Sequence, residues 1–213
     1  MAFLVLMLPT AHAKDLATIT IPVRVHVIKS ATVPVLTAEV SRQELDTVFQ
    51  TVNLIWKQAA IHFEIESVTE LDASAEERFL EAFNGKPVSA RTKSWNMKTM
   101  QHVCDLQSPG KNMINLCVVG AMSNKSGGVA FNSRNRFGLV VWPLSIKGKR
   151  YLNPATLAHE IGHAISLKHN TLEDIFLMRG NGNNMRRVGR YDEIMLTDSE
   201  IDQARKTAKK RLR

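Results

Sequence analysis

The sequence lacks any apolar run that approaches the roughly 20 residues a membrane-spanning helix needs, so no transmembrane anchor is predicted. It also lacks internal repeats, low-complexity tracts and a recognisable domain linker, and nothing in its 213 residues demands a second core. Hydrophobic residues make up 44% of the chain and charged residues 23%, as in most soluble globular domains. These absences favour one soluble globular domain.

Only two cysteines are present, Cys104 and Cys117, so the chain can form at most one internal disulfide. In an oxidising compartment the two thiols could close a short loop and stabilise the fold. The alternative is a pair of unrelated buried thiols, and the sequence leaves both open.

The first thirteen residues are typical of a signal peptide. An apolar run over residues 2–8 is followed by Ala11-His12-Ala13, a small-residue cleavage site before Lys14. No Lys or Arg precedes the run, so a strand or a buried anchor stays open as the alternative. We expect a signal peptide over residues 1–13, a single catalytic domain over 14–213, and a secreted or periplasmic protein.

Positive charge is in excess, with a formal net charge of +8 that favours acidic partners or surfaces. Six basic side chains crowd the end of the chain: Arg205, Lys206, Lys209, Lys210, Arg211 and Arg213. Basic residues near the C-terminus of a helix suit the helix dipole. We therefore interpret this cluster as a solvated helix end, and we do not expect the protein to bind nucleic acid.

The N-terminal half begins with a strand, a long helix and a second strand. Apolar and polar residues alternate over Ile19–Ile28 and again over Ile61–Glu66, which predicts two half-buried strands. Pro22 in the first of them indicates an edge position or a bulge. Between the strands, a capping box of Ser41 and Glu44 opens a helix with an apolar face.

The rest of the chain predicts further strands and two more helices. A short helix over 74–83, a buried strand over 113–119 and a strand over 137–142 are predicted from apolar patterning. Asn153 and Pro154 are typical of a helix N-cap and first residue. Near the C-terminus, Thr197 and Glu200 form a second capping box that opens a final helix.

The predicted helix after Pro154 carries residues suited to hold a zinc ion. His159 and His163 are four residues apart, so their imidazoles project from one helix face and can both reach a metal at about 2.0–2.1 Å. Glu160 lies beside the first ligand and can take a proton from a zinc-bound water. A third ligand must come from beyond the helix, and His169 can serve only if the helix ends and the chain turns back before it.

The segment H-E-I-G-H-A-I-S-L-K-H over residues 159–169 resembles the H-E-x-x-H-x-x-G-x-x-H motif of the metzincin zinc endopeptidases, in particular matrixin-like and reprolysin-like catalytic domains. The resemblance implies that His159, His163 and His169 bind Zn²⁺ and that Glu160 is the general base. It also implies that Met178 forms the methionine turn that lies beneath the metal. Met185 and Met195 are the rival candidates for that turn.

The likeness extends to the whole order of predicted elements. It implies an α+β, zincin-like fold with a twisted mixed sheet, a long backing helix, an active-site helix and a C-terminal helix. A glycine-led segment lies where such enzymes have the edge strand of the substrate cleft: Gly127, Gly128, Val129, Ala130 and Phe131. No tyrosine follows Met178 as a further zinc ligand, because Arg179 and Gly180 stand there.

One position departs from the family pattern. Ser166 replaces the glycine whose backbone, often at positive φ, makes the turn to the third histidine. Serine adopts such a conformation only at some cost. If the turn is not made, Glu173 or Asp174 would be the third ligand, as in His₂Glu zinc sites.

These residues predict a secreted zinc endopeptidase that hydrolyses peptide bonds through a zinc-bound water activated by Glu160. Its partners would be a protein or peptide substrate and, for control, a separate inhibitor. The alternative is a non-catalytic, zinc-stabilised module that binds acidic partners through the basic C-terminus.

Overall fold

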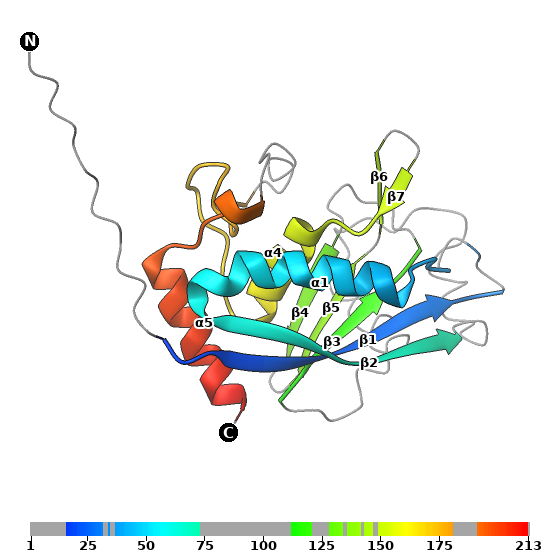
Figure 1. The fold of residues 1–213 in the computed structure, drawn as a ribbon, viewed down its shortest axis with the longest axis horizontal. Coiled ribbons are helices and arrows are strands. Elements are labelled where there is room, and N and C mark those ends of the chain that lie inside the picture. Colours follow the sequence, from blue (N-terminus) through cyan, green and yellow to red (C-terminus); the bar gives the residue numbers. More distant parts are fainter. Residues whose placement is uncertain are drawn as a thin grey trace, which may run out of the picture.

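A five-stranded mixed sheet forms the base of the molecule (Figure 1). The computed structural model describes residues 16–31, 34, 37–72, 112–120, 128–133, 136–141, 143–146, 149–180 and 191–212. The predicted signal peptide, the predicted helix over 74–83 and Cys104 lie outside these residues. Those three predictions therefore stay predictions.

The strands follow the order β2-β1-β3-β5-β4. Their bounds are Ile19–Lys29 for β1, Ile61–Asp72 for β2, Ile114–Val118 for β3, Gly128–Ser133 for β4 and Arg136–Val141 for β5. All neighbours are parallel except β4, which pairs antiparallel to β5 and forms one edge of the sheet. Every strand predicted from the sequence is present, and the second is longer than predicted.

Pro22 was predicted to mark an edge position or a bulge, and in the structure it is paired with Glu64 of β2 alone, because the pairing of β1 with β3 begins at Val23. β1 is flanked by β2 and β3, and its register with β2 shifts between Val23 and Arg24. The predicted irregularity is therefore present, displaced by one residue. Proline has no N–H to donate to a ladder, which suits a position that is paired on one side only.

Two helices cover one face of the sheet (Figure 1). α1 spans Arg42–Trp56, and a short 3₁₀ turn, η2, continues it over Lys57–Ala59. The apolar positions that predicted the helix are all buried: Leu45, Val48, Phe49, Val52, Ile55, Trp56 and Ala59. They join one core cluster with side chains from β1, β3 and α4, the second helix on this face.

α4 spans Pro154–Ala164 and begins as the sequence predicts. The Asn153 side chain accepts hydrogen bonds from the amides of Ala155 and Thr156, at 2.9 and 3.1 Å. A hairpin that the sequence did not predict precedes it, made of β6 (Leu144–Ile146) and β7 (Lys149–Tyr151). Three-residue strands are too short for a periodicity to be recognised.

The C-terminal helix, α5, spans Asp198–Arg211 and carries the complete capping box predicted at Thr197 and Glu200. The prediction that its basic residues are all solvated is wrong for two of them, because Arg205 and Arg211 are both 7% exposed. Arg205 donates to the carbonyls of Ala17, Ala59 and Ala60, which ties α5 to the start of β1 and the end of η2.

Arg211 donates to the carbonyl of Ala164, the last residue of α4. Burial lowers the pKa of the Arg211 guanidinium to about 9. A cation at the C-terminus of a helix is favoured by the helix dipole. α5 thus contacts the end of the helix that carries the histidines.

None of the helices in the described part of the chain has the length and apolar character needed to cross a membrane.

The Arg205→Met variant should lose about 2–4 kcal/mol of unfolding free energy, because three carbonyls lose a buried charged donor. Urea denaturation measures the change. Lys206→Met is the matched control on the exposed side of the same helix and should shift stability by less than about 0.5 kcal/mol. Equal effects of the two substitutions would contradict the role of Arg205.

Candidate metal centre

Three imidazoles converge at the C-terminal end of α4. His169 Nε2 lies 3.1 Å from His159 Nε2 and 2.9 Å from His163 Nε2. One ligand atom of each residue lies within 4.8 Å of the others, and no other group of His, Cys, Asp or Glu within the described ranges could hold a metal ion in this way. The structure thus brings together the three histidines that the spacing singled out.

The protonation of the His159 and His163 rings leaves an unprotonated nitrogen on each that can bind one metal cation. His159 Nδ1 lies 2.6 Å from the Leu177 carbonyl and His163 Nδ1 lies 2.9 Å from the Leu167 carbonyl. A carbonyl oxygen only accepts, so both Nδ1 atoms carry the proton and both Nε2 atoms present lone pairs. His169 Nε2 can donate one hydrogen at most, so it cannot satisfy both.

The spacing also fits. Nitrogens at about 2.0–2.1 Å from one tetrahedral zinc ion lie about 3.3–3.4 Å apart, close to the separations seen here. The residues present therefore fit a zinc ion bound through three Nε2 atoms, with one coordination position left open.

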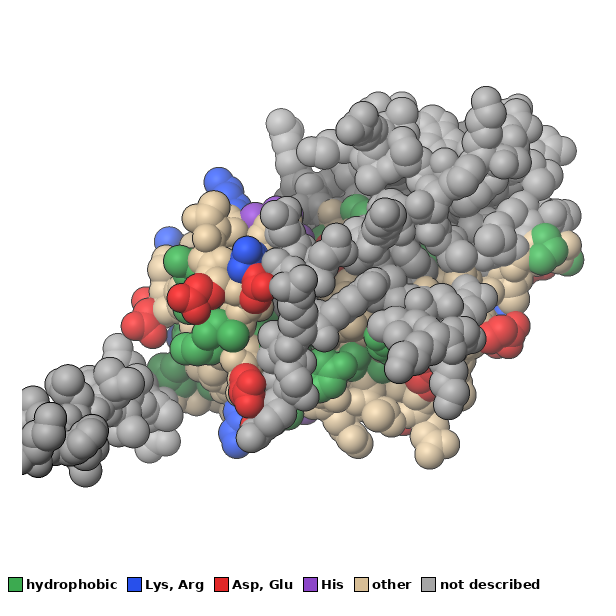
Figure 2. Space-filling model, turned by 90° about the horizontal axis from the view of Figure 1, so that it is seen from above, with side chains coloured by type: hydrophobic (Ala, Val, Ile, Leu, Met, Phe, Trp, Pro, Cys, Tyr) green, Lys and Arg blue, Asp and Glu red, His purple; other side chains and the backbone are tan. Residues whose placement is uncertain are grey.

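Burial decreases across the cluster from His159 to His169, which is exposed. Histidine side chains accordingly reach the surface in Figure 2. Burial lowers the pKa of His159 to about 4, against the opposing effect of its hydrogen bond to Leu177. Burial also lowers the pKa of His163. Both rings are therefore neutral at pH 7, the form in which imidazole binds metals.

Ser166 makes the turn that the sequence left in question. Its φ is 73°, in the left-handed region, although it is not glycine. The amide of Ser166 donates to the carbonyl of His163 at 3.0 Å, and the amide of Leu167 donates to that of Gly162 at 2.9 Å. This pair of bonds is a Schellman motif, which ends the helix and turns the chain back toward His169.

The two carboxylates considered as alternative ligands are not in the cluster. Asp174 forms an ion pair with Arg179, and Glu173 is exposed. His169 is the residue whose ring nitrogen lies within reach of His159 and His163. This geometry favours His169 as the third ligand.

Met178 lies fully buried beneath α4. A Cβ at Gly162 would lie 2.4 Å from Met178 Sδ and 3.6 Å from Trp56 Cζ2, so only glycine lets the methionine pack this closely under the helix. Of the rival methionines, Met195 is 45% exposed and Met185 lies outside the described residues.

The backbone on either side of this methionine orients the cluster. The Leu177 carbonyl accepts from His159, and the Met178 carbonyl accepts from the Asn170 amide at 2.8 Å, next to His169. The Leu177 amide in turn donates to the Met195 carbonyl at 2.8 Å. Such carbonyl partners fix the tautomer and orientation of a ligating histidine.

Two polar side chains bind the segments on which this arrangement depends, namely the backbone around Met195 and the Asn170 side chain. Gln58, beyond α1, donates to the Ile194 carbonyl at 3.0 Å and accepts from the Leu196 amide at 2.7 Å. Glu200, in the capping box of α5, accepts from the Asn170 side chain at 2.8 Å. Sequence reasoning missed both contacts, because their partners are distant in the chain, although Glu200 itself was predicted as part of a capping box.

Glu160 is 8% exposed and lies against the edge strand β4. The Ala130 amide donates to its carboxylate, and a Cβ at Gly128 would lie 2.6 Å from Glu160 Cγ. Burial raises the pKa of Glu160 to about 7, against the opposing effect of the Ala130 hydrogen bond. The sequence analysis did not predict the contact between Gly128 and Glu160. A glycine at the start of a strand can indicate such a close approach of another group to the backbone.

The other predicted site residues have these positions. Gly128, Val129, Ala130 and Phe131 lie in β4, the edge strand, while Gly127 lies outside the described residues. Cys117 is fully buried in β3. Its pairing with Cys104 stays a prediction.

Comparison with known proteins identifies relatives of this chain. A family model described as "Metallo-peptidase family M12B Reprolysin-like" matches residues 43–170, more than half of the sequence. No curated protein gives a significant match.

Two solved structures share the fold at low identity. Metalloproteinase-II from Bacteroides fragilis is 14% identical, with a TM-score of 0.52, over 91% of this chain and 55% of that one. A structure titled "Structure of a chaperone-substrate complex" is also 14% identical, with a TM-score of 0.50, over 92% of this chain and 35% of that one. The chain thus spans about a third to about half of the length of these relatives. The predicted zincin-like α+β fold is confirmed.

Ser166 generates a first prediction for this site. Ser166→Gly should raise the unfolding free energy by about 0.5–1 kcal/mol, since glycine tolerates positive φ. Ser166→Val should lower it by about 1–3 kcal/mol and weaken zinc binding, because a β-branched side chain resists this backbone. Thermal unfolding and chelator competition measure the two effects. A Val variant as stable as the Gly variant would argue against the left-handed turn.

Gly162 generates a second prediction. Gly162→Ala should cost about 1–3 kcal/mol, because its methyl group overlaps Met178 Sδ in a closed core. The Met178→Ala substitution opens a cavity and should cost about 2–5 kcal/mol alone. The double variant should lose less than the sum of the two single losses, because the new methyl group enters the new space. Strict additivity in a double-mutant cycle would show that the two residues do not contact.

Proposed function

Because the chain belongs to the M12B, reprolysin-like family of metallopeptidases and is a metzincin-type zinc metallopeptidase, we propose that it is a secreted endopeptidase with a specific set of site residues. In this proposal His159, His163 and His169 bind zinc, and Glu160 is the general base. Met178 forms the methionine turn beneath the site.

One observation carries the proposal: two Nε2 lone pairs and a third imidazole nitrogen converge, and the residue that follows the first of these histidines in α4 is the buried Glu160. His169 Nε2 lies 2.9 and 3.1 Å from the other two Nε2 atoms. Three protein ligands with an open fourth position distinguish catalytic from structural zinc sites. A histidine group of this kind, with a buried acid on the same helix, is typical of metal-assisted hydrolysis.

The chemistry then divides between the metal and the chain. When bound, zinc supplies Lewis-acid chemistry, since it lowers the pKa of water and polarises a carbonyl group. Glu160 takes a proton on its carboxylate and later delivers that proton to the leaving amine. Gly128 and the Ala130 amide restrict the positions that this carboxylate can adopt, which supports its role as a fixed base.

The substrate is a polypeptide in extended form. β4 lies at the edge of the sheet and contacts Glu160 through Gly128, so a chain added along its open side would pass the site. Main-chain pairing to an edge strand binds peptides with little dependence on sequence. In this proposal Gly127 to Phe131 form the substrate-binding edge.

Secretion or export to the periplasm is supported by the sequence over residues 1–13, which has an apolar run and a small-residue cleavage site. Control by a separate inhibitor is part of the same proposal.

The alternative of a non-catalytic module that binds acidic partners is less well supported. It depends on the basic C-terminal cluster, and two of those six side chains, Arg205 and Arg211, are buried and donate to backbone carbonyls. A solvated cationic surface therefore has fewer charges than the sequence suggested.

Substitution of the base tests the enzyme directly. The Glu160→Gln variant should retain zinc and its melting temperature but lose at least about 100-fold in cleavage of a denatured protein, because it removes the proton acceptor. The assay compares purified residues 14–213 with and without a chelator, and Glu173→Gln is the matched control on an exposed carboxylate.

Wild-type activity that survives full removal of zinc, or equal activity of Glu160→Gln and Glu173→Gln, would overturn the proposal. A protein that binds zinc and cleaves nothing would favour the binding module.

A further inference from the structure

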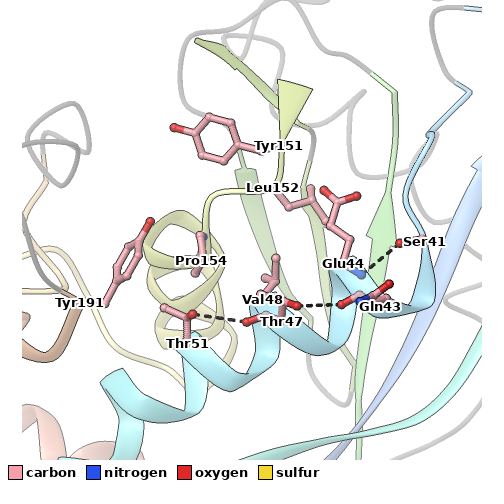
Figure 3. A pocket seen from close by; sticks show the side chains of 10 residues that line it. All are labelled: Ser41, Gln43, Glu44, Thr47, Val48, Thr51, Tyr151, Leu152, Pro154 and Tyr191. Carbon is pink, nitrogen blue, oxygen red and sulfur yellow. Dashed lines mark hydrogen bonds between the residues drawn. The ribbon is translucent and has the colours of Figure 1, made fainter. Parts of the chain in front are cut away.

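A cavity apart from the metal centre lies between α1, the end of β7 and the first turn of α4 (Figure 3). Its volume of about 540 Å³ is within the range of about 300–1,000 Å³ found for small-molecule sites. Its lining comes from the first turns of α1, from the chain that links β7 to α4 and from Tyr191. None of the histidines of the metal centre belongs to it, and neither does Glu160.

Both tyrosines of the chain meet at this cavity. The sequence contains only two, Tyr151 at the end of β7 and Tyr191 in the 3₁₀ turn η4 (Tyr191–Glu193). Figure 3 shows the Tyr151 ring above Leu152 and Pro154, across from α1, and the Tyr191 ring to the left of Pro154. Burial and the nearby Tyr151 phenol raise the pKa of Tyr191. The cavity therefore has two half-buried aromatic rings and an apolar floor.

The wall formed by α1 presents mainly acceptors. Thr47 donates its hydroxyl hydrogen to the Gln43 carbonyl at 2.9 Å, and Thr51 donates to the Thr47 carbonyl at 3.3 Å (Figure 3). A hydroxyl that donates to its own helix keeps its oxygen lone pairs for another partner. These two oxygens are therefore available to accept from a ligand.

Glu44 adds a carboxylate to this wall. The predicted capping box at Ser41 is only half formed, since Ser41 Oγ accepts from the Glu44 amide while the Glu44 side chain makes no described bond in return. At the corresponding place in α5, Glu200 bonds back to Thr197 at 2.8 Å and completes the box. The Glu44 carboxylate instead lines the cavity.

The electrostatics favour a neutral ligand. Glu44 is the only charged side chain among the described lining residues, and it disfavours an anion. The N-termini of α1 and α4 both lie at this cavity. Each adds a partial positive charge equivalent to about half an elementary charge. These partial charges offset the carboxylate and disfavour a cation.

We propose that this cavity binds a neutral saccharide unit. A sugar ring has an apolar C–H face that packs on tyrosine rings, which offer large apolar area together with a polar hydroxyl. Its hydroxyl groups donate to Glu44, Thr47 and Thr51 and accept from the tyrosine hydroxyls and the Gln43 amide. A carboxylate that accepts from a sugar hydroxyl forms a charge-assisted bond and supplies much of the specificity. The inference goes beyond the proposed peptidase activity and does not depend on it.

The two tyrosines make the test direct. Protein labelled with 3-fluorotyrosine gives two ¹⁹F resonances, which Tyr151→Phe and Tyr191→Phe assign. The labelled full chain is titrated with maltose, cellobiose and N,N′-diacetylchitobiose, in the absence of any peptide substrate. At least one disaccharide should shift both resonances saturably, with a dissociation constant on the order of millimolar, as expected for a small open site.

Matched variants decide which groups bind. Glu44→Gln should weaken binding at least about tenfold through loss of the charge-assisted bond, whereas Glu64→Gln removes an exposed carboxylate of β2 and should leave binding unchanged. Unchanged melting temperatures establish that both variants fold. Inorganic phosphate and N-acetyl-lysine amide serve as the anionic and cationic probes.

The proposal is overturned if no disaccharide gives a saturable shift, or if Glu44→Gln and Glu64→Gln bind alike. A saturable response to phosphate or to the lysine derivative that exceeds the response to every sugar overturns it as well. Sugar binding by a protein that cleaves no peptide would contradict only the proposed peptidase, so the two failures are distinguishable.

Discussion

The left-handed backbone at Ser166 is the constraint on which the metal centre depends. Two histidines four residues apart need only a helix, but the third lies on a segment that must run back toward them. α4 ends at Ala164, one residue after His163, and a φ of 73° at Ser166 redirects the chain. A serine in this conformation costs about 1–2 kcal/mol relative to an ordinary backbone. Two Schellman hydrogen bonds and the contact from Arg211 to the helix end offset that cost.

Support for the histidines comes from parts of the chain that are distant in sequence. The 177–178 segment contributes two carbonyls, one to His159 and one to the amide next to His169. That segment pairs with the backbone around Met195, which Gln58 holds from the end of α1. The ligand geometry is therefore a property of the packed fold and not of the motif alone.

Local patterns predicted much of this structure, because local rules governed it. Helical periodicity identified α1, proline chemistry identified the start of α4, and histidine spacing identified the cluster. The failures involve partners that are far apart in sequence. Arg205 looked like a solvated helix residue, since nothing near it in the sequence reveals that it donates to the carbonyls of Ala59 and Ala17. Glu44 matched a capping box, yet its carboxylate lines a cavity. The opposite side of that cavity is formed by residues such as Tyr151 and Leu152, which lie about a hundred positions away in the chain. Sequence could name such residues but not their neighbours.

The contact between Arg211 and Ala164 has a consequence for the order in which the centre is assembled. The two residues are 47 positions apart, so a chain in synthesis has all three histidines and Glu160 well before it has the arginine that secures the end of their helix. The pairing of Leu177, whose carbonyl accepts from His159, with Met195 imposes a similar but shorter delay. A growing chain therefore carries the reactive groups before it can hold them in register. The three histidines therefore reach their final arrangement only after the last helix, α5, has been synthesised.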